Sequence, residues 1–481
     1  MNQSGEKLYD LLILGGGPGG YVAAIRARQL GLSVALVEAE EVGGVCLHHG
    51  CIPSKTLLQG AALLSAIRGA ERFGIQVSEV RADFGLAVAR SEQVVRRLFG
   101  GLQQLMKRHG VTVIIARGRL TAPDTIAFLP NSRTDREEQI RGRHLLIAAG
   151  SRVKTPPGCV ADGRWIYTSD EALIRRDLPT SVVVLGGGPI GCEFAYLYAA
   201  YGARVALIEA ADTLLPSADR EVSELLARQF RLQGIDVQTG VALASGERDG
   251  DGLIVRLTDG REYKSDALLV AVGRTPNTAG IGLSEVGIST QNGAIVVDEQ
   301  MHTSIPGVWA IGDVTTRAAL AHGAMAQGIA VAEAVAGLPG RTVDLKTVPT
   351  AVYCQPQVAW IGRTEAQAKA AGYAVKSCRV PFAANGKAVA IGKTDGFVKV
   401  VCDSASDQIL GAHLIGHDVT ELVGEWSVAI AGGMTIRRFQ SAIHPHPTLS
   451  ETLAEAAAMI SGEAIHFGKG GADTLTRDVH A

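Results

Sequence analysis

Two cysteines separated by a short loop are the side chains with the clearest capacity for redox chemistry. Cys46 and Cys51 lie in the segment VCLHHGCIPSK, which spans residues 45–55. Residues i and i+5 of an ideal helix have Cα atoms about 8–9 Å apart, whereas a disulfide needs them closer than about 7 Å. A bridge therefore requires a distorted turn, which Gly50 and Pro53 favour. The spacing alone leaves two interpretations open, a small redox-active loop or two unrelated buried thiols.

A glycine-rich turn near the start of the chain indicates which kind of domain carries the cysteines. The expected elements are, in order, a strand over Leu8–Leu14, the turn Gly15–Gly20, a helix over Tyr21–Leu30 and a strand over Ser33–Val37 that ends at Glu38. This order is typical of a dinucleotide-binding unit. Gly15 permits the tight turn, Gly17 lets the backbone approach a pyrophosphate, and Gly20 lets helix and strand pack closely. The helix N-terminus then faces the phosphates, and Glu38 accepts hydrogen bonds from ribose hydroxyls.

The same pattern occurs a second time, which argues against accidental glycine turns. The second set consists of a strand over Val182–Leu185, a turn with Gly186, Gly188 and Gly191, a helix from Cys192 and a strand over Arg204–Ile208 that ends at Glu209. The interval from the first glycine to the acid is the same in both sets. The sequence therefore predicts two dinucleotide sites.

The residues after the second unit indicate its coenzyme. Glu209 favours NAD, because an acid there bonds the ribose 2′-hydroxyl and repels a 2′-phosphate. The next residues, Ala210 to Asp212, offer no arginine to hold that phosphate. A reducible disulfide and NAD need an intermediate carrier, because NAD passes hydride whereas thiols exchange through sulfur. A flavin does both, so we expect FAD in the first site.

With these motifs the chain resembles the pyridine nucleotide–disulfide oxidoreductases, from about Leu8 to about His466. The motifs are GGVCLHHGCIPSK at 43–55, IAAG at 147–150, VGRTPN at 272–277, VWAIGDV at 308–314, LAHGAMAQG at 320–328 and HPHPTLSE at 444–451. Within the family the chain is most similar to members that oxidise dihydrolipoamide with NAD⁺. The resemblance implies an α/β fold with two Rossmann-like dinucleotide-binding domains and a C-terminal α+β dimerisation domain, with FAD and NAD as cofactors.

The resemblance also implies roles for single residues. Cys51 is expected to be the charge-transfer thiol against the flavin, and Cys46 the interchange thiol that meets the substrate. Lys55 is expected beside flavin N5 and Glu193 beside the nicotinamide, although a surface lysine and a solvated helix-start glutamate are the simpler alternatives. Further expected cofactor contacts are Gly312, Asp313 on the FAD ribityl chain, Ala321, Gly273 and Arg274.

A histidine and a glutamate near the C-terminus form the expected acid–base pair. The resemblance makes His446 the general base and Glu451 the carboxylate that orients its ring, and thiols that titrate above neutrality require such a base. Glu451 also has a purely structural explanation, because Thr448 and Glu451 fit a capping box at the start of the last helix. His444 is expected to shape the turn, and the resemblance gives His48 and His49 no catalytic role.

The expected reaction joins these groups in one sequence. His446 deprotonates dihydrolipoamide, whose thiolate attacks Cys46, and Cys51 leaves as a thiolate. The second substrate thiol resolves the mixed disulfide, and the electrons pass through the flavin to NAD⁺. The implied partners are a second copy of the chain and, in trans, a lipoyl domain of an acyltransferase or H-protein of a 2-oxoacid dehydrogenase or glycine-cleavage complex.

Other functions remain as alternatives. A relative that reduces another disulfide, such as glutathione disulfide, would use NADPH and carry basic residues after the second unit. A mercuric-ion reductase would end in a cysteine pair, but no cysteine follows Cys402. A scaffold that only carries FAD would not need Cys46, Cys51, His446 and Glu451.

Composition sets outer limits on these hypotheses. The chain has 481 residues, 47% of them apolar, which predicts a multidomain α/β protein. Its net charge is −2, so it has no excess of positive charge that would attract nucleic acid or an anionic membrane. We expect no signal peptide in residues 1–10, no membrane span and no metal site, and therefore a cytoplasmic protein. The expected domains are FAD-binding at 1–149 and 279–347, NAD-binding at 150–278 and interface-forming at 348–481.

Overall fold

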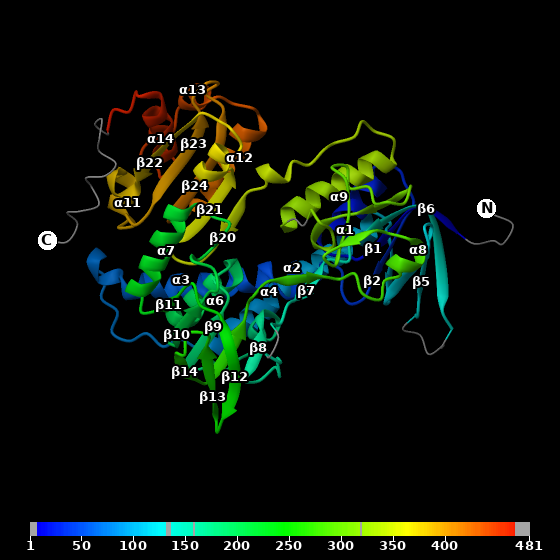
Figure 1. The fold of residues 1–481 in the computed structure, drawn as a ribbon, viewed down its shortest axis with the longest axis horizontal. Helices are drawn as coiled ribbons and strands as arrows, with labels where there is room; N and C mark the ends of the chain where they lie inside the picture. Colours follow the sequence, from blue (N-terminus) through cyan, green and yellow to red (C-terminus); the bar gives the residue numbers. More distant parts are fainter. Residues whose placement is uncertain (1–6, 131–135, 157–158, 318–319, 467–481) are drawn as a thin grey trace.

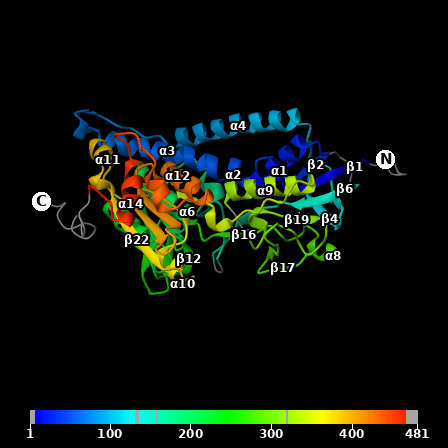
Figure 2. The same cartoon turned by 90° about the horizontal axis from the view of Figure 1, so that it is seen from above.

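The computed structural model describes residues 7–130, 136–156, 159–317 and 320–466. Its three main sheets form two lobes, with the first sheet to the right in Figure 1 and the second and third sheets to the left, one below the other. Figure 2 shows the same division from above. This arrangement confirms the expected α/β fold, while residues 467–481 of the predicted interface domain lie outside the described residues.

The first sheet carries the first glycine turn. Its strands are β1 (Leu8–Leu14), β2 (Val34–Glu38), β3 (Thr112–Ile115), β4 (Gly118–Ala122), β5 (Thr125–Phe128), β6 (Glu138–Ile147) and β19 (Val308–Ala310). The order is β3-β2-β1-β6-β5-β4, and β19 pairs in parallel with β6. Strand β19 follows all strands of the second sheet in the sequence, so its pairing with β6 supports a first domain that is built from two separate parts of the chain. The boundaries of that domain stay a prediction.

Two helices cover one face of this sheet. Helices α1 (Pro18–Gln29) and α9 (Ala321–Val335) pack on each other, and Arg26 on α1 contacts Glu333 on α9 at 2.8 Å. Along β1, Leu11 and Ile13 join the core under these helices, whereas Leu12 and Leu14 join the core of the opposite face. This alternation of side chains is the period-two pattern of a strand buried on both faces.

The second sheet repeats this arrangement with parallel strands. Its strands are β8 (Ile166–Thr168), β9 (Ser181–Leu185), β10 (Arg204–Ile208), β11 (Asp236–Gln238) and β15 (Ala267–Val270), in the order β11-β10-β9-β15-β8. Around it lie α5 (Ser169–Ala172), α6 (Pro189–Tyr201), α7 (Arg220–Leu232) and the meander β12 (Leu243–Asp249), β13 (Gly252–Leu257) and β14 (Glu262–Ser265). The short strands β7 (Ser151–Val153) and β16 (Arg274–Pro276) pair and connect the two sheets.

The third sheet is antiparallel and belongs to the C-terminal part of the chain. Its strands are β20 (Thr350–Val352), β21 (Gln357–Gly362), β22 (Val375–Pro381), β23 (Phe397–Asp403) and β24 (Ile409–Gly416). Helices α12 (Val419–Ala431) and α14 (Glu451–Ser461) pack against it, and the fully buried Trp426 anchors their shared core. The smaller helices of this part are α10 (Glu365–Ala370), α11 (Gly386–Ala390) and α13 (Ile436–Gln440).

The cysteines lie on helices that reach from the first sheet toward the second. These are α2 (Gly44–His48), α3 (Cys51–Arg68) and the long α4 (Phe84–Arg108). Helix α3 packs on α4 and on α6 of the second sheet, and Figures 1 and 2 show it in the left lobe, whereas α2 lies nearer the middle, toward α1. The remaining elements are short: η1 (Ala70–Phe73), α8 (Leu283–Val286), β17 (Thr290–Gln291), β18 (Ala294–Ile295), η2 (Gly312–Val314), η3 (Leu345–Thr347) and η4 (Phe382–Ala384).

The predicted starts of two helices were wrong. The helices expected from Tyr21 and Cys192 begin at Pro18 and Pro189, directly after Gly17 and Gly188. Proline is favoured at the first helical position, because its fixed φ suits a helix and its missing amide hydrogen would have no partner there. The helices therefore present their first turns closer to the glycines than the sequence pattern indicated.

Candidate active site

In the first glycine turn, the space around Gly15, Gly17 and Gly20 differs from one residue to the next. Gly15 has φ +105°, and a Cβ there would lie 2.3 Å from the carbonyl oxygen of Ala148. A Cβ on Gly20 would lie 2.0 Å from the carbonyl oxygen of Gly15, whereas a Cβ on Gly17 would meet nothing within 4 Å. Two glycines are thus required by the protein itself, and Gly17 leaves a bare surface at the N-terminus of α1.

The second glycine turn reproduces these environments closely. Gly186 has φ +109°, and a Cβ there would lie 2.4 Å from the carbonyl oxygen of Ala271. A Cβ on Gly191 would lie 1.8 Å from the carbonyl oxygen of Gly186, and one on Gly188 would meet nothing within 4 Å. The prediction of two equivalent units is confirmed at the level of single atoms.

The acids at the ends of β2 and β10 also match. Glu38 accepts a hydrogen bond from the amide of Gly16 at 2.6 Å, and Glu209 accepts one from the amide of Gly187 at 2.5 Å. The second carboxylate oxygen of Glu209 accepts from the amide of Ala211 at 2.7 Å. Each acid is therefore held beside its glycine turn, where a nucleotide ribose would lie.

The residues of both turns fit a bound dinucleotide. Neither α1 nor α6 has a side chain that caps its first turn, so the amides there are available to phosphate oxygens. The backbone of Gly17 and of Gly188 is open to an approaching group. This chain can accordingly hold FAD at the first turn and NAD at the second, with Glu38 and Glu209 beside the riboses.

The two cysteines lie on either side of a break between helices. Helix α2 contains Cys46 and ends at His48, and α3 starts at Cys51. Gly50 has φ −151° and ψ −108°, and a Cβ on it would lie 2.9 Å from the carbonyl oxygen of Val45. The expected distorted turn is confirmed, and Pro53 occupies the first turn of α3, where it costs no helical hydrogen bond.

The pKa values of the two thiols are shifted in opposite directions. Both cysteines are free thiols in this structure. A hydrogen bond from Cys46 and, after it, the positive charge of Lys55 lower the pKa of Cys51 to about 7, against the opposing effect of burial. The hydrogen bond to Cys51 and burial raise the pKa of Cys46. Cys51 is therefore the thiol that ionises more readily, and Cys46 keeps its proton.

A half-buried ion pair joins the cysteine helix to the second dinucleotide unit. The Nζ atom of Lys55 lies 2.9 Å from both carboxylate oxygens of Glu193 on α6. Glu193 is only 6% exposed and also accepts a hydrogen bond from the amide of Tyr353 at 3.0 Å. The Tyr353 ring lies under the ammonium group, 4.8 Å from Nζ. Lys55 is thus not an ordinary surface lysine, nor is Glu193 a solvated helix-start residue.

Two of the remaining predicted cofactor residues, Asp313 and Arg274, meet at Ser151 on β7. The hydroxyl of Ser151 donates to Asp313 at 2.7 Å, while Arg274 donates to the Ser151 hydroxyl and carbonyl oxygens, both at 2.7 Å. Gly312 has φ +68° and donates its amide to Gln327 on α9 at 2.9 Å. Ala321 is the first residue of α9, and Gly273, with φ +109°, precedes Arg274. Asp313 and Arg274 are therefore tied together across the connection between the two sheets.

The C-terminal pair is formed, but not as a capping box. The Nδ1 atom of His446 lies 2.8 Å from Glu451 Oε1, and the amide of Thr448 donates to Glu451 Oε2 at 2.8 Å. The hydroxyl of Thr448 turns away and donates to the carbonyl of Pro445, and α14 starts only at Glu451. Only half of the predicted capping box is formed: Glu451 accepts from the Thr448 amide, but the Thr448 hydroxyl bonds Pro445, and the N-cap of α14 is Ser450.

The structure separates this histidine from the cysteines of the same chain. The side chain of His446 is 79% exposed. Figures 1 and 2 place α14, beside which His446 lies, well apart from α2. The structure thus brings together Cys46, Cys51, Lys55 and Glu193 within one chain and leaves His446 with Glu451 on the outer surface of the C-terminal part.

Two contributors were absent from the sequence predictions. Ser151 links Asp313 to Arg274, and Tyr353 supports Glu193 and Lys55 through its amide and its ring. No local motif marks either residue, because each acts on residues more than a hundred positions away. Only the folded arrangement reveals them.

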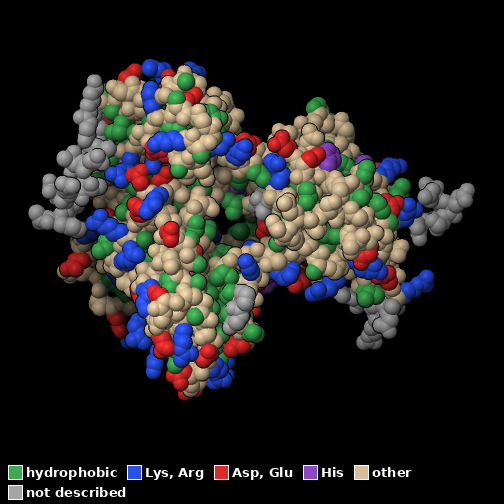
Figure 3. All heavy atoms as spheres, in the orientation of Figure 1, with side chains coloured by type: hydrophobic (Ala, Val, Ile, Leu, Met, Phe, Trp, Pro, Cys, Tyr) green, Lys and Arg blue, Asp and Glu red, His purple; other side chains and the backbone are tan. Residues whose placement is uncertain are grey.

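Two kinds of feature are absent from the part of the chain that the structure describes. No cluster of three or more histidine, cysteine, aspartate or glutamate side chains there could hold a metal ion. Among the described helices, none combines the length and apolarity needed to cross a bilayer. On the face that Figure 3 shows, positive and negative side chains are interspersed, and a hollow separates the two lobes.

Comparisons with known proteins agree with this geometry. Dihydrolipoyl dehydrogenase of Bacillus subtilis is 41% identical over 470 residues, which cover 95% of this chain and 99% of that protein. Dihydrolipoyl dehydrogenase of Zymomonas mobilis is 41% identical over 465 residues, with 95% and 99% covered. Among solved structures, LpdA of Mycobacterium tuberculosis superposes with a TM-score of 0.89 at 26% identity over 94% of this chain and 100% of that chain. The flavoprotein disulfide reductase RclA of Escherichia coli gives a TM-score of 0.83 at 28% identity, with 94% and 100% covered.

Two family descriptions together account for most of the chain. Residues 9–328 match the pyridine nucleotide-disulphide oxidoreductases, and residues 348–457 match the dimerisation domain of the same family. The first match contains both glycine turns and the cysteine pair, and the second contains His446 and Glu451. FAD and NAD(H) are the cofactors of this family, and the dimerisation domain supports a homodimer. The chain belongs to the pyridine nucleotide–disulphide oxidoreductase family.

Proposed function

We propose that this protein is a dihydrolipoyl dehydrogenase, which oxidises dihydrolipoamide to lipoamide and reduces NAD⁺ to NADH. The observation that carries the proposal is the 41% identity, over nearly the whole chain, to relatives of that name. The paired Cys46 and Cys51, the Lys55–Glu193 ion pair and the His446–Glu451 pair supply the groups that this reaction needs. The assignment of these residues as the reacting groups is part of the proposal.

The base is His446. Glu451 accepts the hydrogen bond from Nδ1, so the proton sits on that nitrogen and Nε2 is left to accept one from a substrate thiol. The carboxylate also stabilises the imidazolium that forms. Because the amide of Thr448 holds the other oxygen of Glu451, the carboxylate is fixed before substrate arrives.

The dithiol exchange uses the oxidised form of the cysteine pair. The substrate thiolate attacks Sγ of Cys46, the Cys46–Cys51 bond breaks, and Cys51 leaves as a thiolate. The second substrate thiol then attacks the first substrate sulfur, which releases lipoamide and leaves Cys46 with a proton. The low pKa of Cys51 and the raised pKa of Cys46 match these two roles, because a thiol of lower pKa is the better leaving group.

The flavin connects this exchange with the coenzyme. When bound, FAD would supply the two-electron chemistry that links the reduced cysteine pair to NAD⁺. Lys55 and Glu193, which join α3 to α6, hold the cysteine helix against the second dinucleotide unit. Glu209 selects NAD over NADP because its carboxylate accepts a hydrogen bond from the ribose 2′-hydroxyl and repels a 2′-phosphate.

The complete site is formed by two copies of the chain. His446 is exposed and lies apart from the cysteines of its own chain, and its neighbour Ile443 is 98% exposed. An apolar side chain that is exposed in the single chain is stabilised when a second protein surface covers it. We therefore assign His446 to act on the cysteines of the partner subunit.

The protein partner is a lipoyl domain that presents its dithiol in trans. This partner belongs to the acyltransferase of a 2-oxoacid dehydrogenase complex or is the H-protein of a glycine-cleavage system. A cytoplasmic location is part of the proposal. It accords with seven cysteines that are all free thiols in this structure, four of them buried, since stable structural disulfides are rare in that compartment.

Steady-state assays with paired substrates test the proposal. The purified protein, loaded with FAD, is expected to reduce NAD⁺ with dihydrolipoamide and to have little activity with NADPH and glutathione disulfide. Cys46→Ser and Cys51→Ser variants are expected to lose the first activity. Preference for NADPH and another disulfide would instead identify a reductase of a different substrate.

A further inference from the structure

A second histidine–carboxylate pair lies two residues before the base. The Nε2 atom of His444 lies 2.6 Å from Glu425 Oε1, and its Nδ1 atom lies 3.2 Å from the carbonyl oxygen of Ala442. The side chain of His444 is only 7% exposed, whereas that of His446 is 79% exposed. Both ring nitrogens of His444 face oxygen acceptors, so this ring is held by its neighbours and is not available to a substrate.

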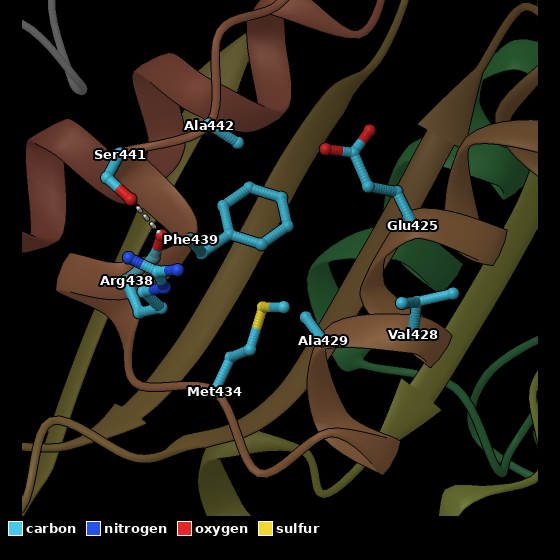
Figure 4. A pocket seen from close by; sticks show the side chains of 8 residues that line it. All are labelled: Glu425, Val428, Ala429, Met434, Arg438, Phe439, Ser441 and Ala442. Atoms are coloured by element: carbon cyan, nitrogen blue, oxygen red, sulfur yellow. Dashed lines mark hydrogen bonds between the residues drawn. The ribbon is translucent and has the colours of Figure 1, made fainter.

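The environment of His444 is part of the rigid core of the C-terminal part. Glu425 is on α12, next to the fully buried Trp426, whose ring stacks on Phe439 with 4.1 Å between ring centres. Phe439 in turn lies 6.1 Å from the ring of His444. Figure 4 shows Glu425 extending from α12 toward Phe439 and Ala442, across a surface pocket of about 480 Å³. His444 therefore joins the segment to α12, whose Trp426 is fully buried.

The segment itself has few other attachments. Residues 441–443 and 445–447 are exposed, so His444 is the one inward side chain between α13 and Thr448. Beyond the base, Asn385 donates to the carbonyl oxygen of Thr448 at 3.0 Å, and Glu451 accepts from the Thr448 amide. The base thus lies between two anchor points, His444 before it and Thr448 after it.

We propose that His444 and Glu425 are positioning residues for the reaction: their hydrogen bond fixes the segment that presents His446 to the partner subunit. This inference rests on the proposed function, in which His446 is the base. Because the side chain of His444 is buried whereas that of His446 is exposed, the Nε2–Oε1 contact sets the place of the base without touching the substrate. Loss of the anchor lets the base move, and displacement by about 1 Å costs a reaction about a hundredfold in rate.

The test compares variants of the full FAD-loaded dimer. His444→Ala and Glu425→Ala are each expected to lower kcat for dihydrolipoamide oxidation about tenfold to a hundredfold, and the double variant to lose no more than either alone. His444→Gln keeps a donor near Glu425 and is expected to recover most of the rate. NADH oxidation by ferricyanide, which needs neither the base nor the cysteine exchange, is expected to change less than about twofold in all of them.

A matched control and an independent readout separate positioning from general damage. His466 and Glu455 form another histidine–carboxylate contact, at 3.3 Å, in the same part of the chain, and His466→Ala is expected to leave both activities unchanged. Hydrogen exchange of amides 441–450 is expected to accelerate in His444→Ala and not in His466→Ala. Unchanged exchange, or equal losses in both activities, would overturn the inference. If wild-type protein failed to oxidise dihydrolipoamide, the proposed function would fall, while the exchange measurement would still decide whether His444 anchors the segment.

Discussion

Removal of the positive charge of Lys55 should make Cys51 a weaker acid. Lys55 follows Cys51 by one turn of α3, and side chains so spaced on a helix have Cβ atoms about 5–6 Å apart. A unit charge about 6 Å away contributes about 3 kcal/mol at an effective dielectric constant of about 20, equivalent to about two pKa units. Because a third of the Lys55 side chain is exposed to solvent, we expect about half of this, so that Lys55→Met raises the pKa of Cys51 from about 7 to about 8.

The direction follows from the charges that surround the thiol. Lys55 lowers the pKa of Cys51 and Glu193 raises it, so loss of Lys55 removes a stabilising charge and also leaves the carboxylate unopposed. Glu193→Gln should have the reverse effect and lower the pKa of Cys51. Lys55→Arg keeps the charge and serves as the control.

The assay measures the rate of alkylation of Cys51 against pH in a Cys46→Ser background, where the serine hydroxyl still donates to Cys51. Only the thiolate reacts, so the midpoint of the rate profile reports its pKa. At pH 6 the Lys55→Met variant should react about tenfold more slowly than the Lys55 protein. An identical midpoint in the two proteins would show that Lys55 does not stabilise the thiolate and would refute this account of the site.

Three further predictions concern the cofactors and the assembly. Gly20→Ala should lower the melting temperature of the FAD-free protein, because the added Cβ would lie 2.0 Å from a carbonyl oxygen. A Cβ at Gly17 would meet nothing within 4 Å, so the Gly17→Ala protein should keep its melting temperature but bind FAD more weakly in a fluorescence titration. NAD should be preferred over NADP in kcat/KM by at least about a hundredfold, and Glu209→Gln should narrow that preference; equal use of both coenzymes by wild type would contradict the role of Glu209. Random remixing of inactive Cys51→Ser and His446→Ala dimers should restore about a quarter of wild-type activity, whereas no recovery after verified exchange would place the base in cis.

Local backbone geometry explains why much of the site could be predicted from the sequence. The two glycine turns are demanded by close contacts, such as that of Gly191 with the carbonyl oxygen of Gly186, and only glycine meets such a requirement. The acids that follow are fixed by bonds to the adjacent turn amides. Features that depend on a few neighbouring residues therefore leave a readable pattern.

The parts that escaped prediction depend on distant partners or on competition for one group. Lys55 and Glu193 were each expected near a cofactor, but their direct pairing across 138 positions was not. Ser151 bridges to Asp313 over 162 positions, and no spacing rule reveals such a contact. The capping box is incomplete because the hydroxyl of Thr448 donates to the carbonyl oxygen of Pro445, while the carboxylate of Glu451 serves both the Thr448 amide and His446.

Electrons are expected to pass from a dithiol to NAD⁺ through Cys46, Cys51 and bound FAD, and no other cysteine is expected to take part. Oxidised, FAD-loaded protein is mixed without oxygen with one equivalent of dihydrolipoamide per subunit, quenched with a maleimide, and digested for mass spectrometry. We predict that Cys46 and Cys51 become labelled and that labelling of the other five cysteines is unchanged. Addition of NAD⁺ before the quench should remove both labels and yield one NADH per subunit. NADH formation without any change in the labelling of Cys46 and Cys51 would contradict the claim.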